Sequence, residues 1–258
     1  MARLLVISDI HGNLYSLSAV LEHAKGWDEL VVLGDLVDYG PHPDEVIDVL
    51  RGYDARMVRG NHDHAVAFGV DCRCGERTHW LSVWFRENVT LRLLGDNQRR
   101  YLASLPLKLD LEIDGLNIHI VHAAPSNPLY AYLYPWLDNS QVCKLLKSHG
   151  PLRLSGDRGG GCPQGLYLVG HTHYQFYRVV DGAIVANPGS VGQPRDGDPR
   201  AGYMIIDTTR EAIELYRVKY DVGRTVKALM ELGVPEPYMS ALKYMLQHGR
   251  IPPRPKPP

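Results

Sequence analysis

The sequence has few cysteines, no excess of charge of either sign and no long apolar run. Its four cysteines in 258 residues show no even disulfide framework, which argues against a small disulfide-stabilised scaffold; they are Cys72, Cys74, Cys143 and Cys162. Lys and Arg number 28 against 29 Asp and Glu, so the net charge is −1. A nucleic-acid or anionic-membrane coat needs a clustered basic excess, so we expect neither partner.

The apolar runs are those of a globular protein. The longest, such as residues 4–7 and 118–121, have the length of strands, whereas a membrane-spanning helix needs about 20 apolar residues. A strand pattern begins at residue 3, so we expect no signal peptide and a cytoplasmic protein. Hydrophobic residues make up 45% and charged residues 22% of the chain, which excludes the disordered and fibrous classes.

Strand and helix patterns alternate in the N-terminal part of the chain. Buried-strand patterns at residues 3–8, 29–33 and 55–58 enclose helical patterns at residues 14–25 and 43–50. Because this order is β-α-β-α-β, it predicts a parallel sheet in this region.

The later part of the chain reads as hairpins followed by helices. Asp114-Gly115 and Asp181-Gly182 each separate two strand patterns and predict tight hairpins. The Gly- and Pro-rich residues 151–165 predict a loop. We divide the chain into a main domain (1–220), C-terminal helices (221–250) packed on that domain or at a homodimer contact, and a Pro-rich tail (251–258).

Several strand patterns end in side chains that commonly bind metals. In open α/β sheets, sites form outside the carboxyl ends of the strands, so a sheet would bring these side chains to one rim. Neighbouring glycines such as Gly34 and Gly60 allow the tight turns that this requires. The candidate ligands are Asp9, His11, Asp35, Asn61, His122, His171 and His173.

The types of these side chains select the metal chemistry. Imidazole and carboxylate ligands without thiolate suit Mn, Fe, Zn, Co or Ni better than Mg or Ca. Seven candidates are too many for one tetrahedral ion but suffice for two ions bridged by a carboxylate. Two metals ~3.5–4 Å apart commonly clamp a phosphoryl group and activate water for its displacement.

The ligand-bearing segments also resemble a known family. In their order along the chain they are similar to the five motif blocks of the calcineurin-like metallophosphoesterase superfamily, and residues 187–192 resemble the continuation seen in its small prokaryotic members. The resemblance covers about residues 1–220. It implies an α/β fold, a four-layer α-β-β-α sandwich of two mixed sheets flanked by helices, with a C-terminal helical extension. The blocks are Asp9-Ile10-His11, Gly34-Asp35-Leu36-Val37-Asp38, Gly60-Asn61-His62-Asp63, His122 and Gly170-His171-Thr172-His173.

The resemblance implies a role for each of these residues. It implies two divalent transition-metal ions, Mn first and Fe, Zn, Co or Ni as alternatives, with Asp35 as the bridging ligand. His62 would be the catalytic imidazole, oriented by Asp38 or Asp63. One metal would take Asp9, His11, Asp35 and His173, and the other Asp35, Asn61, His122 and His171.

The expected activity is hydrolysis of a phosphodiester or nucleotide phosphoanhydride by metal-bound hydroxide. Arg59 and Arg195 are expected to contact a second phosphate or a base of a small phosphorylated or nucleotide substrate. Residues 37–41 read Val-Asp-Tyr-Gly-Pro, whereas protein Ser/Thr phosphatases of the superfamily carry Asp-Arg-Gly there. The pattern is therefore closer to small prokaryotic phosphodiesterases and diadenosine tetraphosphate hydrolases.

Three other functions are compatible with the same residues. They are a protein or small-molecule phosphomonoesterase, a catalytically silent metal-bound scaffold or regulatory subunit, and a nuclease. The near-neutral charge argues against the nuclease. Cys72-Arg73-Cys74 resembles half of a metal or redox motif, but no second pair accompanies it, so we expect an ordinary reduced loop.

Overall fold

The structure is a computed structural model that describes residues 1–147 and 161–253. Most of the loop predicted at 151–165, and residues 254–258 of the predicted tail, lie outside the described residues. Within the described part, no helix combines the length and the apolar character that crossing a bilayer would require.

The first sheet contains the predicted parallel strands. Its order is β10-β9-β1-β2-β3. β1 pairs with β2 and β2 with β3 in parallel, which confirms the β-α-β-α-β prediction, while β9 joins β1 antiparallel and makes the sheet mixed. The strands are β1 (Arg3–Ile7), β2 (Glu29–Val32), β3 (Arg56–Met57), β9 (Ala201–Asp207) and β10 (Ala212–Val218).

The second sheet, of order β4-β5-β6-β8-β7, contains the two predicted hairpins. Asp114 and Gly115 both have positive φ, as do Asp181 and Gly182, which is the conformation that a two-residue type I′ turn needs. β6 lies between the two hairpins and pairs in parallel with β5 of the first and β8 of the second. The strands are β4 (Lys108–Ile113), β5 (Leu116–Val121), β6 (Gly165–Leu168), β7 (Gln175–Val180) and β8 (Ala183–Pro188).

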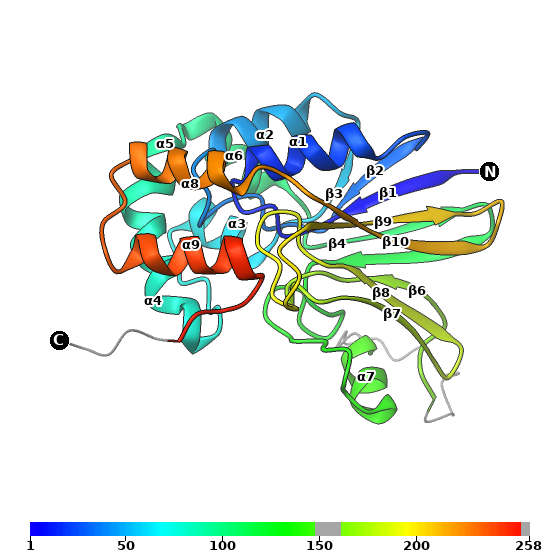
Figure 1. The fold of residues 1–258 in the computed structure, drawn as a ribbon. Coiled ribbons are helices and arrows are strands. Elements are labelled where there is room, and N and C mark those ends of the chain that lie inside the picture. Colours follow the sequence, from blue (N-terminus) through cyan, green and yellow to red (C-terminus); the bar gives the residue numbers. More distant parts are fainter. Residues whose placement is uncertain (148–160, 254–258) are drawn as a thin grey trace.

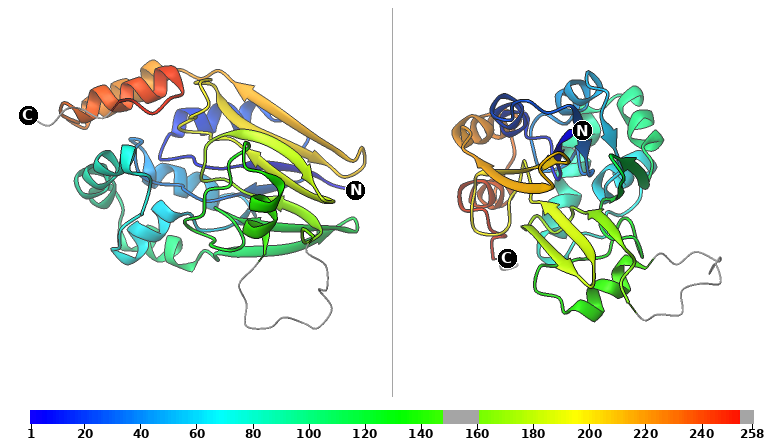
Figure 2. Two further views of the ribbon diagram at one scale, coloured as in Figure 1. Left: turned by 90° about the horizontal axis from the view of Figure 1, so that it is seen from below. Right: turned by 90° about the vertical axis from the view of Figure 1, so that its right-hand side faces the viewer.

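The sheets form the two inner layers of a four-layer sandwich (Figures 1 and 2). Alternation along β1 shows why: Leu4 and Val6 pack with residues of the second sheet, whereas Leu5 and Ile7 pack beneath helices. α1 (Leu14–His23), α2 (Pro43–Arg51) and α6 (Asp96–Ser104) cover the outer face of the first sheet, and α7 (Asn139–Leu146) covers that of the second. The predicted fold class is confirmed.

The structure contains helical segments beyond those that the sequence patterns predict. The motif beginning at Asn61 opens a helix, α3 (Asn61–Phe68). α4 (Glu76–Phe85) matches the helical pattern of residues 78–87, and it continues into a π-helical turn, η1 (Arg86–Thr90), and a short helix, α5 (Leu91–Leu93). α3 carries polar residues in its first turn and has little apolar periodicity, so its sequence did not show the usual helical signal.

One pair of cysteines corrects the expectation of no disulfide. Cys143 of α7 is bonded to Cys162, which precedes β6, with a Cα–Cα distance of 4.6 Å. The two lie 19 residues apart in sequence, and only the packing of α7 on the second sheet brings them together. Cys72 and Cys74 are free, as expected, although both are buried.

The C-terminal helices lie at one end of the sandwich, opposite the N-terminus in two views (Figures 1 and 2). α8 (Val222–Glu231) and α9 (Tyr238–His248) bury apolar residues against α4, among them Leu229 and Leu242 against Phe85. Thr225 of α8 also hydrogen-bonds the side chain of Asn13, with 3.1 Å between the two oxygens.

Truncation of a buried side chain on α9 tests this packing. Leu242 is 1% exposed, so Leu242→Ala is expected to lower the free energy of unfolding by ~2–5 kcal/mol through lost burial and a residual cavity. Urea unfolding of the full chain measures the change, with the exposed Lys243→Ala as control. Equal stability of the two variants would show that α9 is not docked in solution.

Candidate metal centre

The structure brings the seven candidate ligands together in one buried site. Each lies just beyond a strand of one of the two sheets or in the first turn of α3, which follows β3. All seven side chains are almost completely buried: Asp9, His11, Asp35, Asn61, His122, His171 and His173 are between 0 and 3% exposed.

Asp9, His11 and His173 form the first cluster, with ligand atoms within 4.8 Å of one another. The Nδ1 of His11 donates to the Val37 carbonyl over 2.9 Å, and the Nδ1 of His173 to the Gln193 carbonyl over 2.6 Å. Each neutral ring therefore carries its lone pair on Nε2, and the two Nε2 atoms are 3.3 Å apart. Two lone pairs facing each other repel unless a cation lies near both.

The pKa values of these two rings agree with this view. Burial lowers the pKa of His11 to about 3, and burial together with the charge of Arg195 holds the pKa of His173 well below its ordinary value. Both rings are thus neutral at physiological pH, the state in which imidazole binds a metal.

Asp35, His122 and His171 form the second cluster. The Nδ1 of His122 donates to the Leu33 carbonyl over 2.7 Å, which directs its Nε2 toward the other ligands. That Nε2 lies 3.0 Å from the Asn61 side-chain oxygen and 3.2 Å from the Nδ1 of His171. Donor atoms of three residue types thus converge on one small volume.

Asp35, a member of the second cluster, also faces the first cluster. Its Oδ2 lies 3.9 Å from the Nε2 of His11 and 3.3 Å from the Nε2 of His122. His122 and His62 hold the pKa of Asp35 well below its usual range in spite of burial, so it is a carboxylate. An anionic oxygen facing both groups has the position that a bridging ligand requires.

Unsatisfied polar atoms also indicate that the site fits cations. Asp9 Oδ1 and His171 Nε2 are buried and have no hydrogen-bond partner among the described residues, a situation that is otherwise costly. Burial opposes the charge on His122, but Asp35 outweighs it and raises the pKa of His122 to about 9. The field that attracts a proton to His122 would equally attract a metal ion, which would displace that proton.

The backbone at these ligands is unusual. Five of the seven have positive φ, a conformation that costs about 1–3 kcal/mol for a residue other than glycine and that clusters at functional sites. Hydrogen bonds between the loops after β1 and β2, such as Ile10 N–H to the Asp35 carbonyl, hold these turns together. The five are Asp9 (52°), His11 (48°), Asp35 (56°), His171 (62°) and His173 (62°).

His62 lies beside the first cluster, with its ring 5.1 Å from that of His11. The Nδ1 of His62 is 2.8 Å from a carboxylate oxygen of Asp38. Arg86 donates to the same oxygen from Nε over 3.0 Å and from Nη2 over 2.8 Å. Burial opposes the charge of His62, but Asp35 and Asp38 keep its pKa above the ordinary value.

The structure separates the two carboxylates that the sequence left open as partners of His62. Asp38 contacts the imidazole, as described above. The Asp63 carboxylate instead accepts backbone N–H groups of Asp35, Leu36 and Gly60 over 2.8–2.9 Å. These contacts join the loop after β2, which carries Asp35, to the start of α3.

Two residues beside His62 were missed by the sequence analysis. Arg86 is 6% exposed and donates to the Ser82 hydroxyl over 3.0 Å as well as to Asp38. The Ser82 oxygen is 3.4 Å from the His62 Nδ1. The two residues are four positions apart at the end of α4, but no pattern links them to a motif 48 residues earlier.

The two predicted substrate-binding arginines differ in surroundings. Arg59 donates to the Ala103 carbonyl over 2.6 Å and stacks on Phe68, so its contacts join α3 to α6. Arg195 is half-buried and donates to the Gln193 side chain over 2.7 Å, near the residue that orients His173. Arg195 thus lies beside the loop that orients a candidate ligand, whereas the contacts of Arg59 are with two helices.

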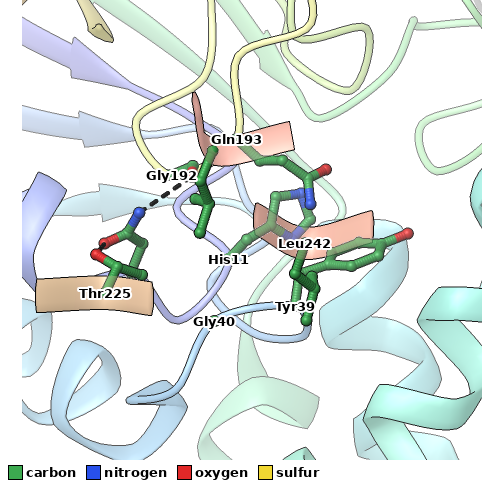
Figure 3. Close-up of a pocket in the computed structure, with 9 residues that line it drawn as sticks. His11, Tyr39, Gly40, Gly192, Gln193, Thr225 and Leu242 are labelled. Carbon is green, nitrogen blue, oxygen red and sulfur yellow. Dashed lines mark hydrogen bonds between the residues drawn. The ribbon is translucent and has the colours of Figure 1, made fainter. Parts of the chain in front are cut away.

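Residues of the C-terminal helices line a small cavity beside His11 of the first cluster. Figure 3 shows His11, Tyr39 and Gln193 around a cavity beneath Leu242 of α9, with Thr225 of α8 beside Gly192. The cavity measures about 10 Å³, about the room of one water molecule. Access for a substrate must therefore come from another side.

Removal of the shared carboxylate tests the two-metal interpretation. Asp35→Ala is expected to abolish binding of both ions, because each would lose an anionic ligand. Metal content per chain after Mn²⁺ loading and desalting measures this, with Asp48→Ala on the exposed face of α2 as control. Retention of both ions by the Asp35 variant would contradict the bridging position.

The comparisons with known proteins agree with this centre. The calcineurin-like phosphoesterase superfamily domain matches residues 2–211. An uncharacterized protein of Methanocaldococcus jannaschii is 30% identical over 250 residues, covering 90% of this chain and 93% of the relative. The crystal structure of a metallophosphoesterase from Sphaerobacter thermophilus is 30% identical with a TM-score of 0.75, covering 96% of this chain and 99% of that one.

A more distant structure shows that the fold extends beyond close sequence similarity. A hypothetical protein from Pyrococcus horikoshii OT3 has a TM-score of 0.76 at 21% identity, covering 98% of this chain and 100% of the other. The C-terminal helices lie within the regions matched by both structures. With the family domain spanning most of its length, the chain belongs to the calcineurin-like phosphoesterase superfamily.

Proposed function

We propose that this metallophosphoesterase is a dinuclear enzyme that hydrolyses a phosphodiester or a nucleotide phosphoanhydride. The observation that carries the proposal is the pair of buried Asp/His clusters, with the Asp35 carboxylate of the second cluster also facing His11 of the first. One ion would be held by Asp9, His11, Asp35 and His173, and the other by Asp35, Asn61, His122 and His171. Manganese is the metal we favour, since the ligand set has imidazoles but no thiolate.

Bound divalent ions would withdraw charge from the phosphoryl group and promote ionisation of the attacking water. The protein itself supplies the ligand geometry and the proton. Asp38 and Arg86 fix the orientation of the His62 ring. Since Asp35 and Asp38 favour the protonated ring, His62 is suited to donate a proton to the leaving oxygen.

Two features favour a small phosphorylated or nucleotide substrate over a phosphoprotein. The segment Val37-Asp38-Tyr39-Gly40-Pro41 lacks the arginine found there in protein Ser/Thr phosphatases of the superfamily. Arg195 lies next to the first cluster, where a guanidinium can bind a second phosphate. The near-neutral charge of the chain gives no support to a nuclease.

A pair of chromogenic substrates tests the proposed activity. Mn²⁺-loaded protein is expected to hydrolyse bis-p-nitrophenyl phosphate faster than p-nitrophenyl phosphate, and metal-stripped protein is expected to hydrolyse neither. Preference for the monoester would favour a phosphomonoesterase. Two bound ions with no turnover of either compound, or of nucleotide anhydrides, would favour a silent scaffold and contradict the proposal.

His62→Ala tests the proton donor. It is expected to reduce kcat by ~10²–10⁴ because the general acid is lost, while metal content stays at that of the wild type. The exposed His248→Ala serves as control. Arg86→Leu leaves the Asp38 carboxylate beside His62 without its guanidinium partner, which raises the pKa of the His62 imidazole. Because a general acid is lost above its pKa, the basic limb of the pH profile of kcat is expected to shift to higher pH. A wild-type rate in His62→Ala would remove His62 from the mechanism.

A further inference from the structure

Three stacked aromatic side chains lead away from the second cluster; we call Tyr132, Tyr134 and Trp136 the aromatic strip. Tyr132 contacts the His171 ring at 4.3 Å between centroids. Tyr134 is nearly parallel to Tyr132 at 5.5 Å, and Trp136 is nearly parallel to Tyr134 at 4.6 Å. Alternate residues of one irregular segment thus form a continuous stack that begins at a candidate metal ligand.

The outer end of the aromatic strip is exposed and yet fixed. Trp136 is 62% exposed, whereas large aromatic side chains are usually well covered. Arg178 donates to the carbonyls of Pro135 and Leu137, over 3.1 and 2.6 Å, on either side of Trp136. Tyr174 packs edge-on against the indole at 5.0 Å. The indole is therefore preorganised, with an aromatic face available to a flat ligand.

A cavity of about 340 Å³ adjoins the aromatic strip, because Tyr174 lines this cavity and also contacts Trp136. Its lining includes Arg77, Arg195 and Arg250. The loop after β8 (yellow in Figure 1) meets the end of α9 (red) through a hydrogen bond from Gly197 N–H to the Gly249 carbonyl, which brings Arg250 there.

The cavity has an excess of positive charge. Its one carboxylate, Asp196, is paired with Arg217, which does not line it. Within residues 1–147 and 161–253, Arg77, Arg195 and Arg250 form no ion pair. Three guanidinium groups without a counter-charge in one cavity are suited to an anion with several oxygens, such as a phosphate group.

Arg195 connects the cavity with the metal centre. Arg195 donates to the side chain of Gln193, whose backbone carbonyl accepts from the Nδ1 of His173 in the first cluster. Arg195 also lines the cavity together with Tyr174, which packs edge-on against Tyr134 of the aromatic strip at 5.9 Å. The arginine-lined cavity is thus connected through one residue each to the first cluster and to the aromatic strip.

We propose that the aromatic strip and the arginine-lined cavity form a subsite for nucleotides, with the base stacked on Trp136 and a second phosphate bound by Arg77, Arg195 and Arg250. The cavity volume lies at the lower end of the range for small-molecule sites, about 300–1,000 Å³. A single exposed ring fits one base rather than a strand of nucleic acid, which would need a longer basic groove. The inference names the substrate class and rests on the proposed function for cleavage, but not for binding.

The test compares a nucleotide with its base-free counterpart. Mn²⁺-loaded protein is titrated with α,β-methylene-ADP and with methylenediphosphonate, and Kd is measured by calorimetry. Base stacking is worth ~5–150-fold in affinity, so Trp136→Ala is expected to weaken binding of the nucleotide by about 10-fold and leave that of methylenediphosphonate unchanged. Trp136→Phe, which keeps a ring, should restore most of the nucleotide affinity.

Two further variants complete the test. Arg250→Ala is expected to weaken binding of both compounds, because each carries the second phosphate group. Tyr177→Ala, an exposed aromatic on β7 outside the aromatic strip, is expected to change neither. Equal nucleotide affinity in Trp136→Ala and the wild type, or no nucleotide binding at all, would overturn the subsite. Because binding is measured without turnover, a failed hydrolysis assay would count against the proposed function alone.

Discussion

The convergence of buried lone pairs on one small volume is the constraint on which the rest of this structure depends. His11 and His173 direct unprotonated nitrogens at each other, and Asp35 directs an anionic oxygen at two imidazoles. Such an arrangement is unfavourable in an apolar interior unless cations share the electron pairs. The backbone carbonyls of Val37, Gln193 and Leu33 enforce it, because each fixes the tautomer of one ring. The backbone thus holds the ligand atoms in positions suited to a metal ion without help from the ion itself.

This frame needs loops that hold conformations they would not adopt alone. Positive φ at ligand after ligand is tolerated because neighbouring loops bind one another and leave no space for other conformations. A Cβ at Gly60 would overlap the Asp35 carboxylate, and one at Gly170 would overlap the Ser8 side chain. The Asp63 carboxylate accepts three further backbone hydrogen bonds, two from the loop after β2 and one from Gly60. Strain at the centre is therefore compensated by contacts just outside it.

Much of this fold and of the candidate centre could be predicted from local patterns in the sequence. Short apolar runs and the Asp-Gly turns located the strands, and strand-end Asp and His residues located the candidate centre, because both signals are local. The pairing of Cys143 with Cys162 and the contact of Arg86 with Asp38 could not be predicted, since each depends on packing between distant segments. The sequence left the choice between Asp38 and Asp63 open for a related reason: both lie in the motifs, and only the folded backbone brings Asp38 to the His62 ring and the Asp63 carboxylate to backbone N–H groups.

The candidate metal ligands and the residues of the proposed nucleotide subsite lie on different kinds of segment. The candidate ligands lie at strand ends, where the sheets fix them, and the family domain contains them all. The aromatic strip lies on an irregular segment after β5, and Arg250 lies beyond the matched residues 2–211. Loops on a rigid scaffold can change without disturbing the scaffold's own packing. Such segments can therefore vary around one metal centre, and in this chain they present the indole of Trp136 and the guanidinium groups of Arg195 and Arg250, while Arg77 comes from α4.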